Sequence, residues 1–449
     1  MSHSTGLVVD KRDQAHAFGK YHWALGRDAT GADNVVANGG DYGTPRPVSA
    51  LSGVRIARVA VGFNSAFAAS ETELWAWGMN RRGQLATGDR DHRAAPTKVG
   101  FPFDGKRIIT CLAADDCRAV VVLSGKAYTW GESFAAGRPD VLQPAEVGWP
   151  SIEDGAVGAA GLLEAPRPPL VAAYLGCYFA VALDASGSVF WWGEKSLGLE
   201  GLEATLRKIP SLRKVVHASV GFKHCLAMTL SGEVYAFGRN TCNQVVALPN
   251  TEDMIHSPLK VLGLDQVEVA TVYAGGGTSF VVSKCGQVRA WGYGGDGALA
   301  TGLRHEIRRV GPTVVDSLLG KHVTSLSGSS GFVAVAKDRF GVESYITWGR
   351  TAVVVAEKES SRIVLEPHTF ALSGLAEKHA NAFEAPTLAL AAPAPETRAP
   401  TPAEPRAPTP SAYVGGALLR FAGPAATALR SGARMLRPCG CKVADCTDQ

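Results

Sequence analysis

Apolar and polar residues alternate along short segments of the chain, and the same kind of segment recurs through most of the sequence. In "LSGEVYAFGRN" (Leu230–Asn240) alternate residues are apolar, and the strand pattern ends in an aromatic residue followed by glycine. A period of two residues is typical of a β-strand with one buried face. Similar segments end at seven aromatic-glycine pairs, spaced by roughly 55 residues, which are Phe18-Gly19, Trp77-Gly78, Trp130-Gly131, Trp192-Gly193, Phe237-Gly238, Trp291-Gly292 and Trp348-Gly349. This recurrence indicates a repeat architecture.

Each repeat contains two strands joined by a tight turn. "HCLAMTL" leads into a turn with Ser-Gly, and "EVYAFG" returns. A glycine-bearing turn between two alternating segments predicts a β-hairpin. Several short strands per unit, repeated radially, predict a β-propeller, which leaves few exposed sheet edges. We therefore expect an all-β fold, a seven-bladed β-propeller over residues 1–375, followed by a Pro/Ala-rich and partly helical C-terminal tail.

Composition supports this fold class and excludes several others. The chain of 449 residues has 51 glycines and 19% charged residues, which suits a turn-rich β protein. A net charge of +4 does not support nucleic-acid binding, for which a strongly basic face is expected. No apolar run is long enough to predict a transmembrane helix. The start "MSHSTGLVVD" has neither a secretion signal nor an Arg-rich presequence.

The nine cysteines are odd in number and scattered, which fits reduced thiols better than a disulfide framework. We therefore expect an intracellular protein of the cytoplasm, nucleus or cytoskeleton, with the mitochondrion left open. No P-loop, nucleophile elbow or HExxH spacing is present, so we predict no catalytic residue and no cofactor. Cys439, Cys441 and Cys446 lack the histidine or second cysteine pair of a zinc site, and we predict no metal. Acylation of these cysteines is the alternative to an ordinary reduced tail.

The periodicity stops near residue 376. Residues 376–411 are rich in Pro and Ala and predict an extended linker. Residues 412–449 contain an amphipathic basic helix in which Leu418, Leu429 and Leu436 share one face. Such a helix is expected to dock on a partner groove or to make peripheral contact with a membrane surface, and disorder in the free state is the alternative.

The repeat resembles the regulator of chromosome condensation repeat family. "WGMNRRGQLATG" (Trp77–Gly88) matches the family's Trp-Gly, N-x-x-G-Q-L-x-x-G pattern, and "GFKHCLAMTLSGEVYAFGRN" (Gly221–Asn240) keeps its Gly-x-x-His-x-x-Ala core. The resemblance covers about residues 7–350. It implies a propeller whose ring is closed by mixing the two chain ends in one blade. Because "LVVDKRDQAHAFG" aligns with "FVVSKCGQVRAWG", the chain begins inside a blade, and we expect the segment after Gly349 to complete it.

The family resemblance also implies possible activities. Its founding member is a nucleotide exchange factor for the small GTPase Ran and also sits on nucleosomes. The basic N-terminal arm of a nucleosome binder is absent here. The ultraviolet-sensing branch needs a cluster of tryptophans beyond the anchor strands, whereas only Trp23 and Trp149 lie outside them. The longest insertion, residues 149–170, reads as a flexible loop better than as a wedge that displaces a nucleotide.

Two sets of residues are candidates for partner binding. In the second full repeat, Ala114-Asp115-Asp116-Cys117 stands in place of Gly-x-x-His, and the paired Asp115 and Asp116 are candidates to bind a basic group. Basic residues recur at similar distances after three anchor glycines, which predicts that they line one rim and steer an acidic partner. These are Arg90 and Arg93; Arg207 and Lys208; and Arg304, Arg308 and Arg309.

We conclude from the sequence that the protein is a non-enzymatic protein–protein interaction scaffold within an intracellular complex or large assembly. Fold alone does not select the partner. One alternative is a guanine nucleotide exchange factor for a small GTPase. A second alternative is a structural component of an axoneme or a mitochondrial ribosome.

Overall fold

The computed structural model describes most of the chain up to residue 370. The described residues are 5–19, Gly26 and 46–370, apart from gaps at 11, 63, 116, 135–138, 150–167, 194–202, 247–252, 302–307, 329–330 and 352–361. The chain divides into two units, residues 1–392 and 393–449, and everything described belongs to the first. The predicted linker at 376–411 and the predicted helix and cysteines at 412–449 lie outside the described residues.

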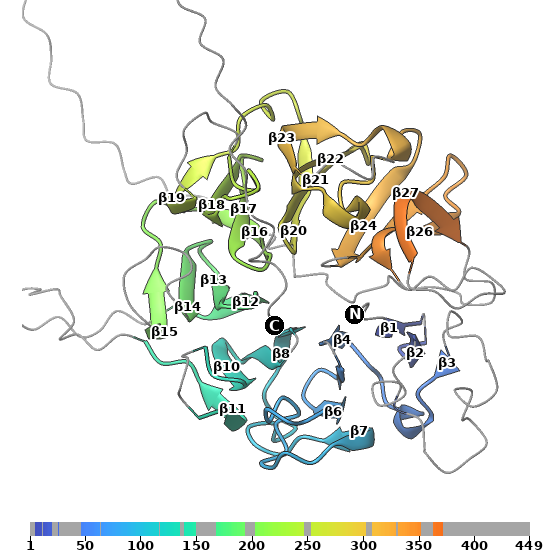
Figure 1. Ribbon diagram of the computed structural model, residues 1–449. Helices are drawn as coiled ribbons and strands as arrows, with labels where there is room; N and C mark the ends of the chain where they lie inside the picture. Colours follow the sequence, from blue (N-terminus) through green and yellow to red (C-terminus); the bar gives the residue numbers. More distant parts are fainter. Residues whose placement is uncertain are drawn as a thin grey trace, which may run out of the picture. The chain divides into compact units, whose positions relative to one another are not determined.

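Antiparallel sheets stand side by side around a common centre, and six of them have four strands (Figure 1). Within each, every strand pairs with its neighbour in the sequence, from the inner strand to the outer one. The first three are β4 (Arg58–Val61), β5 (Ser65–Ala69), β6 (Leu74–Gly78), β7 (Arg93–Lys98); β8 (Ile109–Ala114), β9 (Arg118–Leu123), β10 (Lys126–Gly131), β11 (Val141–Glu146); and β12 (Leu170–Leu175), β13 (Phe179–Asp184), β14 (Val189–Gly193), β15 (Glu203–Lys208).

The next three are β16 (Val215–Val220), β17 (His224–Thr229), β18 (Val234–Arg239), β19 (Met254–Lys260); β20 (Val269–Gly275), β21 (Thr278–Ser283), β22 (Val288–Tyr293), β23 (Arg308–Val314); and β24 (His322–Gly328), β25 (Gly331–Lys337), β26 (Glu343–Thr351), β27 (Arg362–Phe370). The inner strands β4, β8, β12, β16, β20 and β24 contact one another in this order around the centre. The prediction of an all-β propeller is therefore confirmed.

The remaining sheet has three strands, β1 (Thr5–Val9), β2 (Ala15–Gly19) and β3 (Arg46–Pro47), and lies between the blades β24–β27 and β4–β7 (Figure 1). The described residues thus form six four-stranded blades rather than the predicted seven. Thr5 pairs with Gly19 as Thr278 pairs with Gly292, so the sequence alignment of these two hairpins is confirmed. β1 and β2 thus correspond to the second and third strands of a complete blade.

The predicted completion of this first sheet by the segment after Gly349 is wrong. That segment forms β27, in which Val364 pairs with Gly349 and Phe370 with Tyr345 of β26. It is the outer strand of its own blade, because the last repeat needs a fourth strand like every other.

In the described part of the chain the only helical elements are short 3-10 turns, at Ser49–Leu51, Gly295–Gly297 and Asp316–Leu318. None of the described residues forms a helix with the length and apolar character needed to cross a bilayer.

The anchor aromatics whose side chains the structure describes pack inside the propeller. The side chains of Trp77, Trp130, Trp192, Trp291 and Trp348 are fully buried. Trp130 of β10 donates its indole N–H to the Gln84 carbonyl of the preceding blade at 2.8 Å, and it contacts Phe67 of that blade edge-on at 6.1 Å. Trp348 donates in the same way to Ala298 at 3.0 Å. The anchor aromatics therefore join consecutive blades.

The backbone conformation at the anchor position requires a glycine. Gly78 and Gly131 have φ values of +106° and +95°, which side-chain-bearing residues rarely adopt. A Cβ on either would collide with the backbone carbonyl that precedes the second strand of the same blade, at Asn64 or Cys117. The polar motif after the anchor is equally structural: buried Asn80 accepts the Leu85 N–H at 2.9 Å, and Gln84 accepts the Arg82 N–H at 2.8 Å.

Two faces of the propeller follow from this strand order. The hairpin face carries the turns between second and third strands and the connections from each outer strand to the next inner strand. The loop face carries the turns between first and second strands and the connections from third to outer strands. Because all strands are antiparallel, any loop residue can be assigned to one of these faces.

Candidate functional site: a polar junction on the loop face

Arg118 occupies the position that His224 holds in its own blade. His224 pairs with the anchor Gly238, and Arg118 pairs with the anchor Gly131. The sequence alignment placed Cys117 at this position and was wrong by one residue. Because Asp115 precedes Arg118 as Gly221 precedes His224, the second full repeat reads Asp-x-x-Arg in place of Gly-x-x-His.

Both residues link their blade to the next one. His224 lies 3.0 Å through Nε2 from Ser279 Oγ of β21, and Ser279 donates to the Gln244 carbonyl at 2.6 Å. Arg118 donates through Nη1 to the Cys177 carbonyl, in the turn between β12 and β13, at 2.6 Å. Arginine extends further than histidine, so it also reaches groups within its own blade.

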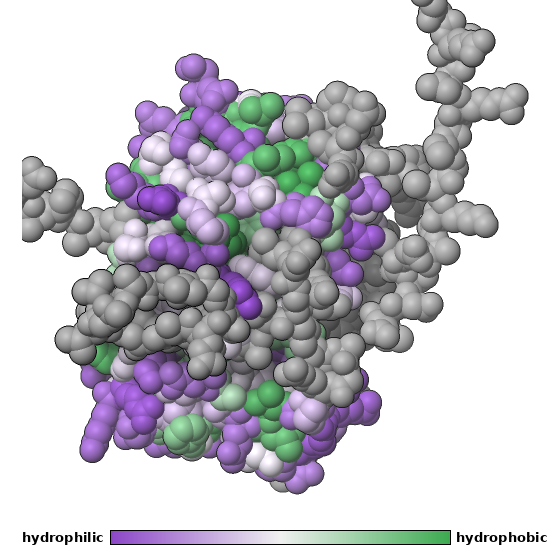
Figure 2. Space-filling view, turned by 90° about the vertical axis from the view of Figure 1, so that its left-hand side faces the viewer, coloured by the Kyte–Doolittle hydropathy of each residue, from purple (hydrophilic) through white to green (hydrophobic). Residues whose placement is uncertain are grey.

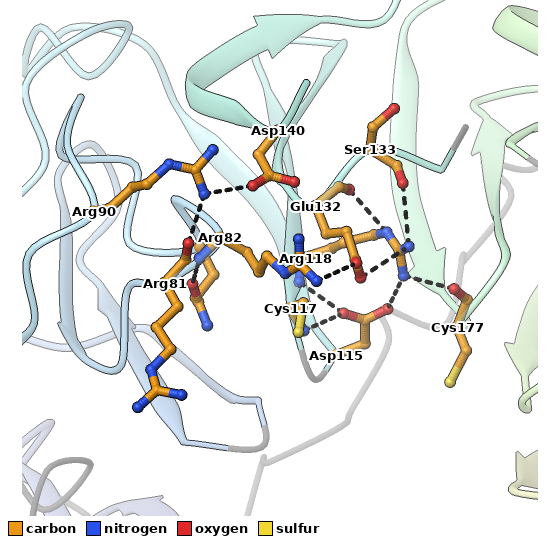
Figure 3. Close-up of polar contacts among 11 residues, drawn as sticks. Arg81, Arg82, Arg90, Asp115, Cys117, Arg118, Glu132, Ser133, Asp140 and Cys177 are labelled. Atoms are coloured by element: carbon orange, nitrogen blue, oxygen red, sulfur yellow. Dashed lines mark hydrogen bonds and ion pairs between the residues drawn. The ribbon is translucent and has the colours of Figure 1, made fainter. Parts of the chain in front are cut away.

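The Arg118 guanidinium is almost surrounded (Figure 3). Its Nε donates to the Glu132 carbonyl at 2.9 Å, and Nη2 lies 3.4 Å from both the Ser133 carbonyl and Glu132 Oε2. Nη1 lies 3.4 Å from Asp115 Oδ2, and the ring of Phe134 lies 4.7 Å from the guanidinium carbon. The side chains of Arg118 and Asp115 are only 11% and 10% exposed. This arrangement is a rigid junction of two blades.

Asp115 is engaged within the junction. Its Oδ1 accepts the backbone N–H groups of Cys117 at 3.0 Å and Arg118 at 2.7 Å, while Oδ2 faces the guanidinium. The carboxylate therefore shapes the turn between β8 and β9. Asp116, its predicted partner in binding a basic group, lies outside the described residues.

Arginines of the preceding blade extend the polar surface (Figure 3). Arg82 lies 3.5 Å from Glu132, and Arg90 lies 2.5 Å from Asp140 while donating to the Arg81 carbonyl at 2.6 Å. All of these residues come from loop-face connections. Positive and negative groups alternate here, so the surface suits a charged, hydrogen-bonding protein partner better than a polyanion.

The predicted basic rim is only partly assembled. Arg93 pairs with the anchor Gly78 and Arg309 with the anchor Gly292, with Arg308 beside it, so these positions lie at the loop face. Arg207 and Lys208 pair with Trp191 and Phe190, at the other end of the outer strand. The loop after Gly193 is shorter than the loops after Gly78 and Gly292. A residue at the same distance from the anchor glycine therefore lies further along the outer strand in this blade. Arg304 lies outside the described residues.

Exposed apolar side chains gather on the opposite face. Of the nine large exposed hydrophobic residues in the described part of the chain, seven lie in hairpin-face segments: Phe101, Ile108, Leu230, Leu262, Leu319, Phe340 and Val342. Phe222 lies on the loop face and Leu259 within β19. We call these seven the apolar tips. The side of the molecule at β15 and β19 instead shows separate apolar islands among polar residues (Figure 2).

Sequence reasoning missed Arg118, Glu132 and the apolar tips. An arginine one residue past the expected histidine position was a usable signal, as were apolar residues inside turn segments such as "KDRFGVE" (Lys337–Glu343). The described residues contain no group of three or more His, Cys, Asp or Glu side chains arranged to hold a metal ion.

Comparison with known proteins bears on this fold. Models of the regulator of chromosome condensation (RCC1) repeat match residues 72–120 and 215–244. The ultraviolet-B receptor UVR8 of Arabidopsis thaliana is 30% identical over 307 residues, 66% of this chain and 64% of the receptor. The E3 ubiquitin-protein ligase HERC2 of Homo sapiens is 28% identical over 293 residues, 61% of this chain but 5% of the ligase. The chain thus spans less than two thirds of the length of these relatives.

A solved structure shows the same fold. The structure of Prp20p from Saccharomyces cerevisiae matches with a TM-score of 0.62 and 20% identity, covering 81% of this chain and 87% of Prp20p. Repeated four-stranded blades around a common centre define the class as a β-propeller. The two matched segments show that this β-propeller contains regulator of chromosome condensation (RCC1) repeats.

Proposed function

We propose that the protein is a protein–protein interaction platform that binds its principal partner through the apolar tips of the hairpin face. The observation that carries this proposal is the one-sided distribution of exposed apolar side chains. Phe340 is 76% exposed and Phe101 65%. Apolar groups concentrated on one face of a soluble domain mark interaction sites.

The tips have the composition of a protein-binding surface. Basic residues are close by: the Arg339 guanidinium carbon lies 4.8 Å from the Phe340 ring centroid, and Leu230 donates its N–H to the Lys214 carbonyl. Acidic residues are also present, since Lys260 pairs with Glu233 and Lys126 with Glu146. Balanced charges around apolar anchors favour a protein partner with an apolar core and a polar rim.

Replacing three tips, Leu230, Leu262 and Phe340, with serine is expected to reduce partner recovery from cell extract at least tenfold. Substitutions at exposed positions change stability little, so the unfolding midpoint should stay within a few degrees of that of the unmodified protein. The matched control is Phe222→Ser, an exposed aromatic on the loop face. A photo-crosslinking amino acid placed at Leu230, Phe340 or Phe222 identifies the contact directly. Equal loss of recovery for the control, or crosslinks at Phe222 alone, would contradict the proposal.

Guanine nucleotide exchange on a small GTPase is the second proposal, and it would use the loop face. Prp20p of Saccharomyces cerevisiae binds Gsp1p and histones. At 20% identity the similarity shows only a shared fold, so the proposal rests on the polar surface around Arg82, Arg90 and Glu132.

The exchange proposal predicts accelerated release of labelled GDP when the full-length protein is mixed with a panel of purified GTPases. Arg90→Ala and Arg82→Ala should reduce this release, because both residues belong to the loop face, whereas the triple serine variant of the tips should retain it. If no GTPase releases nucleotide faster than its intrinsic rate, the scaffold proposal stands alone. Recovery of many subunits of one assembly through the tips would favour the structural-component alternative.

A further inference from the structure

The outer strands of the complete blades are sheet edges, and all of them except β15 have a proline at the same register position. The residue after this position pairs with the residue before the anchor aromatic, as Thr97 pairs with Ala76 and Leu259 with Ala236. The prolines at this position are Pro96, Pro144, Pro258, Pro312 and Pro367. Because proline has no N–H, these edges cannot donate a hydrogen bond to an added strand at this position.

In β15 the corresponding residue is Leu206. Arg207 pairs with Trp191, the residue before the anchor aromatic, so Leu206 corresponds to the prolines of the other blades. Its N–H points away from its own sheet and donates to the Gly148 carbonyl at 2.9 Å. Gly148 and Thr205 form an isolated parallel bridge. The edge of β15, the outermost strand of its blade (Figure 1), therefore accepts an added strand.

The chain itself occupies this edge with a short segment, residues 147–149, which we call the strap. Val147 donates its N–H to a carbonyl of β10 at 2.8 Å, so the strap begins on the preceding blade. Trp149 contacts the ring of Phe190 in β14 edge-on, with ring centroids 4.9 Å apart. The strap thus crosses from the second complete blade to the edge of the third.

The strap is a weak occupant of the edge. Its strand pairing depends on Gly148, and glycine in a strand loses more conformational freedom than other residues and packs no side chain. A Cβ added at Gly148 would meet only the Thr205 methyl group, at 3.7 Å, which is an ordinary contact. A strand residue with a side chain therefore fits in the same place and is expected to bind the edge more strongly.

The chain at the C-terminal end of this edge is basic. Residues 207–214 read "RKIPSLRK" and contain no acidic residue. Lys208, Arg213 and Lys214 are exposed. Because the bridge to β15 is parallel, the C-terminal end of an added strand points toward Lys208. Acidic side chains at that end would be attracted to this segment.

We propose that the edge of β15 is a docking site for an extended segment of a protein partner. The segment replaces the strap, adds parallel to β15 and places acidic residues beside Lys208 and Arg213. Main-chain hydrogen bonds such as the one from Leu206 supply affinity in this mode of recognition, and the side chains supply specificity. The site is separate from the apolar tips, and the inference does not rest on the function proposed above.

A labelled peptide tests the site on the full-length protein. The probe copies residues 145–149 with Gly148→Val, followed by Glu-Asp-Glu, and should bind with a dissociation constant of about 100 μM or tighter by fluorescence anisotropy. Leu206→Pro removes the donor and should weaken binding roughly tenfold. The unfolding midpoint of this variant should change little, because proline stands at the same register position in the other blades. Equal binding by the variant and the unmodified protein would overturn the proposal.

Two further comparisons test the strap and the charges. Trp149→Ser removes the strap's contact with Phe190, and it should speed amide exchange at Leu206 and tighten peptide binding roughly threefold. A peptide that binds neither this variant nor the unmodified protein would also overturn the proposal.

Reversing the charges with Lys208→Glu and Arg213→Glu should weaken peptide binding roughly fivefold. The control, Lys284→Glu with Lys321→Glu, makes the same change in net charge at exposed positions outside this blade and should leave binding unchanged. Equal weakening by both pairs would show that the peptide responds to net charge and not to the edge of β15. The triple serine variant of the tips should bind the peptide as the unmodified protein does, which separates this inference from the one on the tips.

Discussion

Replacing Arg118 with methionine is expected to lower the free energy of unfolding by about 3 kcal/mol, because it leaves a nearly buried carboxylate and several carbonyls without their donor. Methionine keeps much of the volume, so the loss reports the polar contacts. Asp115 is 10% exposed, and its Oδ2 loses the guanidinium. The carbonyls of Glu132, Ser133 and Cys177 lose the same donor at once. Denaturant unfolding of the two proteins measures the difference.

Arg82→Met is the matched control, since Arg82 contacts the same Glu132 from a side chain that is 52% exposed. Exposed ion pairs contribute about 0–1 kcal/mol, so this variant should remain close to the parent. Arg118→Lys keeps the charge but has fewer donors in a different geometry, and should lie between the two. If Arg118→Met is no less stable than Arg82→Met, the junction does not hold the blades together.

Acidification from pH 6.5 to 4.5 is expected to destabilise the propeller by roughly 2–3 kcal/mol for each of two buried histidines. Burial lowers the pKa of His217 to about 4 and the pKa of His224 to about 3, from 6.5. Both remain neutral in the folded protein, while in the unfolded chain they bind protons below pH 6.5. The unfolded state therefore takes up more protons, and stability is lost as pH falls from 6.5 toward the folded pKa values.

The variant His217→Gln with His224→Gln separates this effect from other titrations. It should be less stable than the parent at pH 7, because His224 loses its contact with Ser279, yet its unfolding midpoint should change less between pH 6.5 and 4.5. His256→Gln, at an exposed position of β19, is the control for the substitution type. A double variant with an unchanged pH slope would show that these two histidines do not govern acid sensitivity.

Much of the ring was predictable because its construction is local. Each hairpin is encoded by alternation around a glycine turn, and the anchor tryptophans and Phe237 are buried in the structure as a packing role requires. Ring closure was not predictable in the same way, because the segment after Gly349 alternates as an outer strand does. Only the observed pairing of Tyr345 with Phe370 assigns it to its own blade.

The candidate site was harder to predict than the fold. Counting residues from the anchor glycines predicted correctly that Arg93 and Arg309 lie at the loop face. The same count was wrong for Arg207, because the loop length differs between blades. The one-residue shift between Cys117 and Arg118 changed which side chain joins two blades. Alternation gives the face of a strand on which a residue lies, but a network such as that of Arg118 depends on distances between blades.

The pairing of every described strand with its neighbour in the sequence has a consequence for how the chain acquires its structure. Hairpins and whole blades contain only contacts between residues close in sequence, so their formation requires little loop closure and is expected to be fast. Blades can then be added in order as the chain emerges during synthesis, each against the inner strand of its neighbour. The three-stranded sheet and the blade β24–β27 are neighbours in the ring but far apart in the sequence (Figure 1). Bringing these two sheets together requires the largest loop closure, so this contact is expected to form in the slow stage of folding.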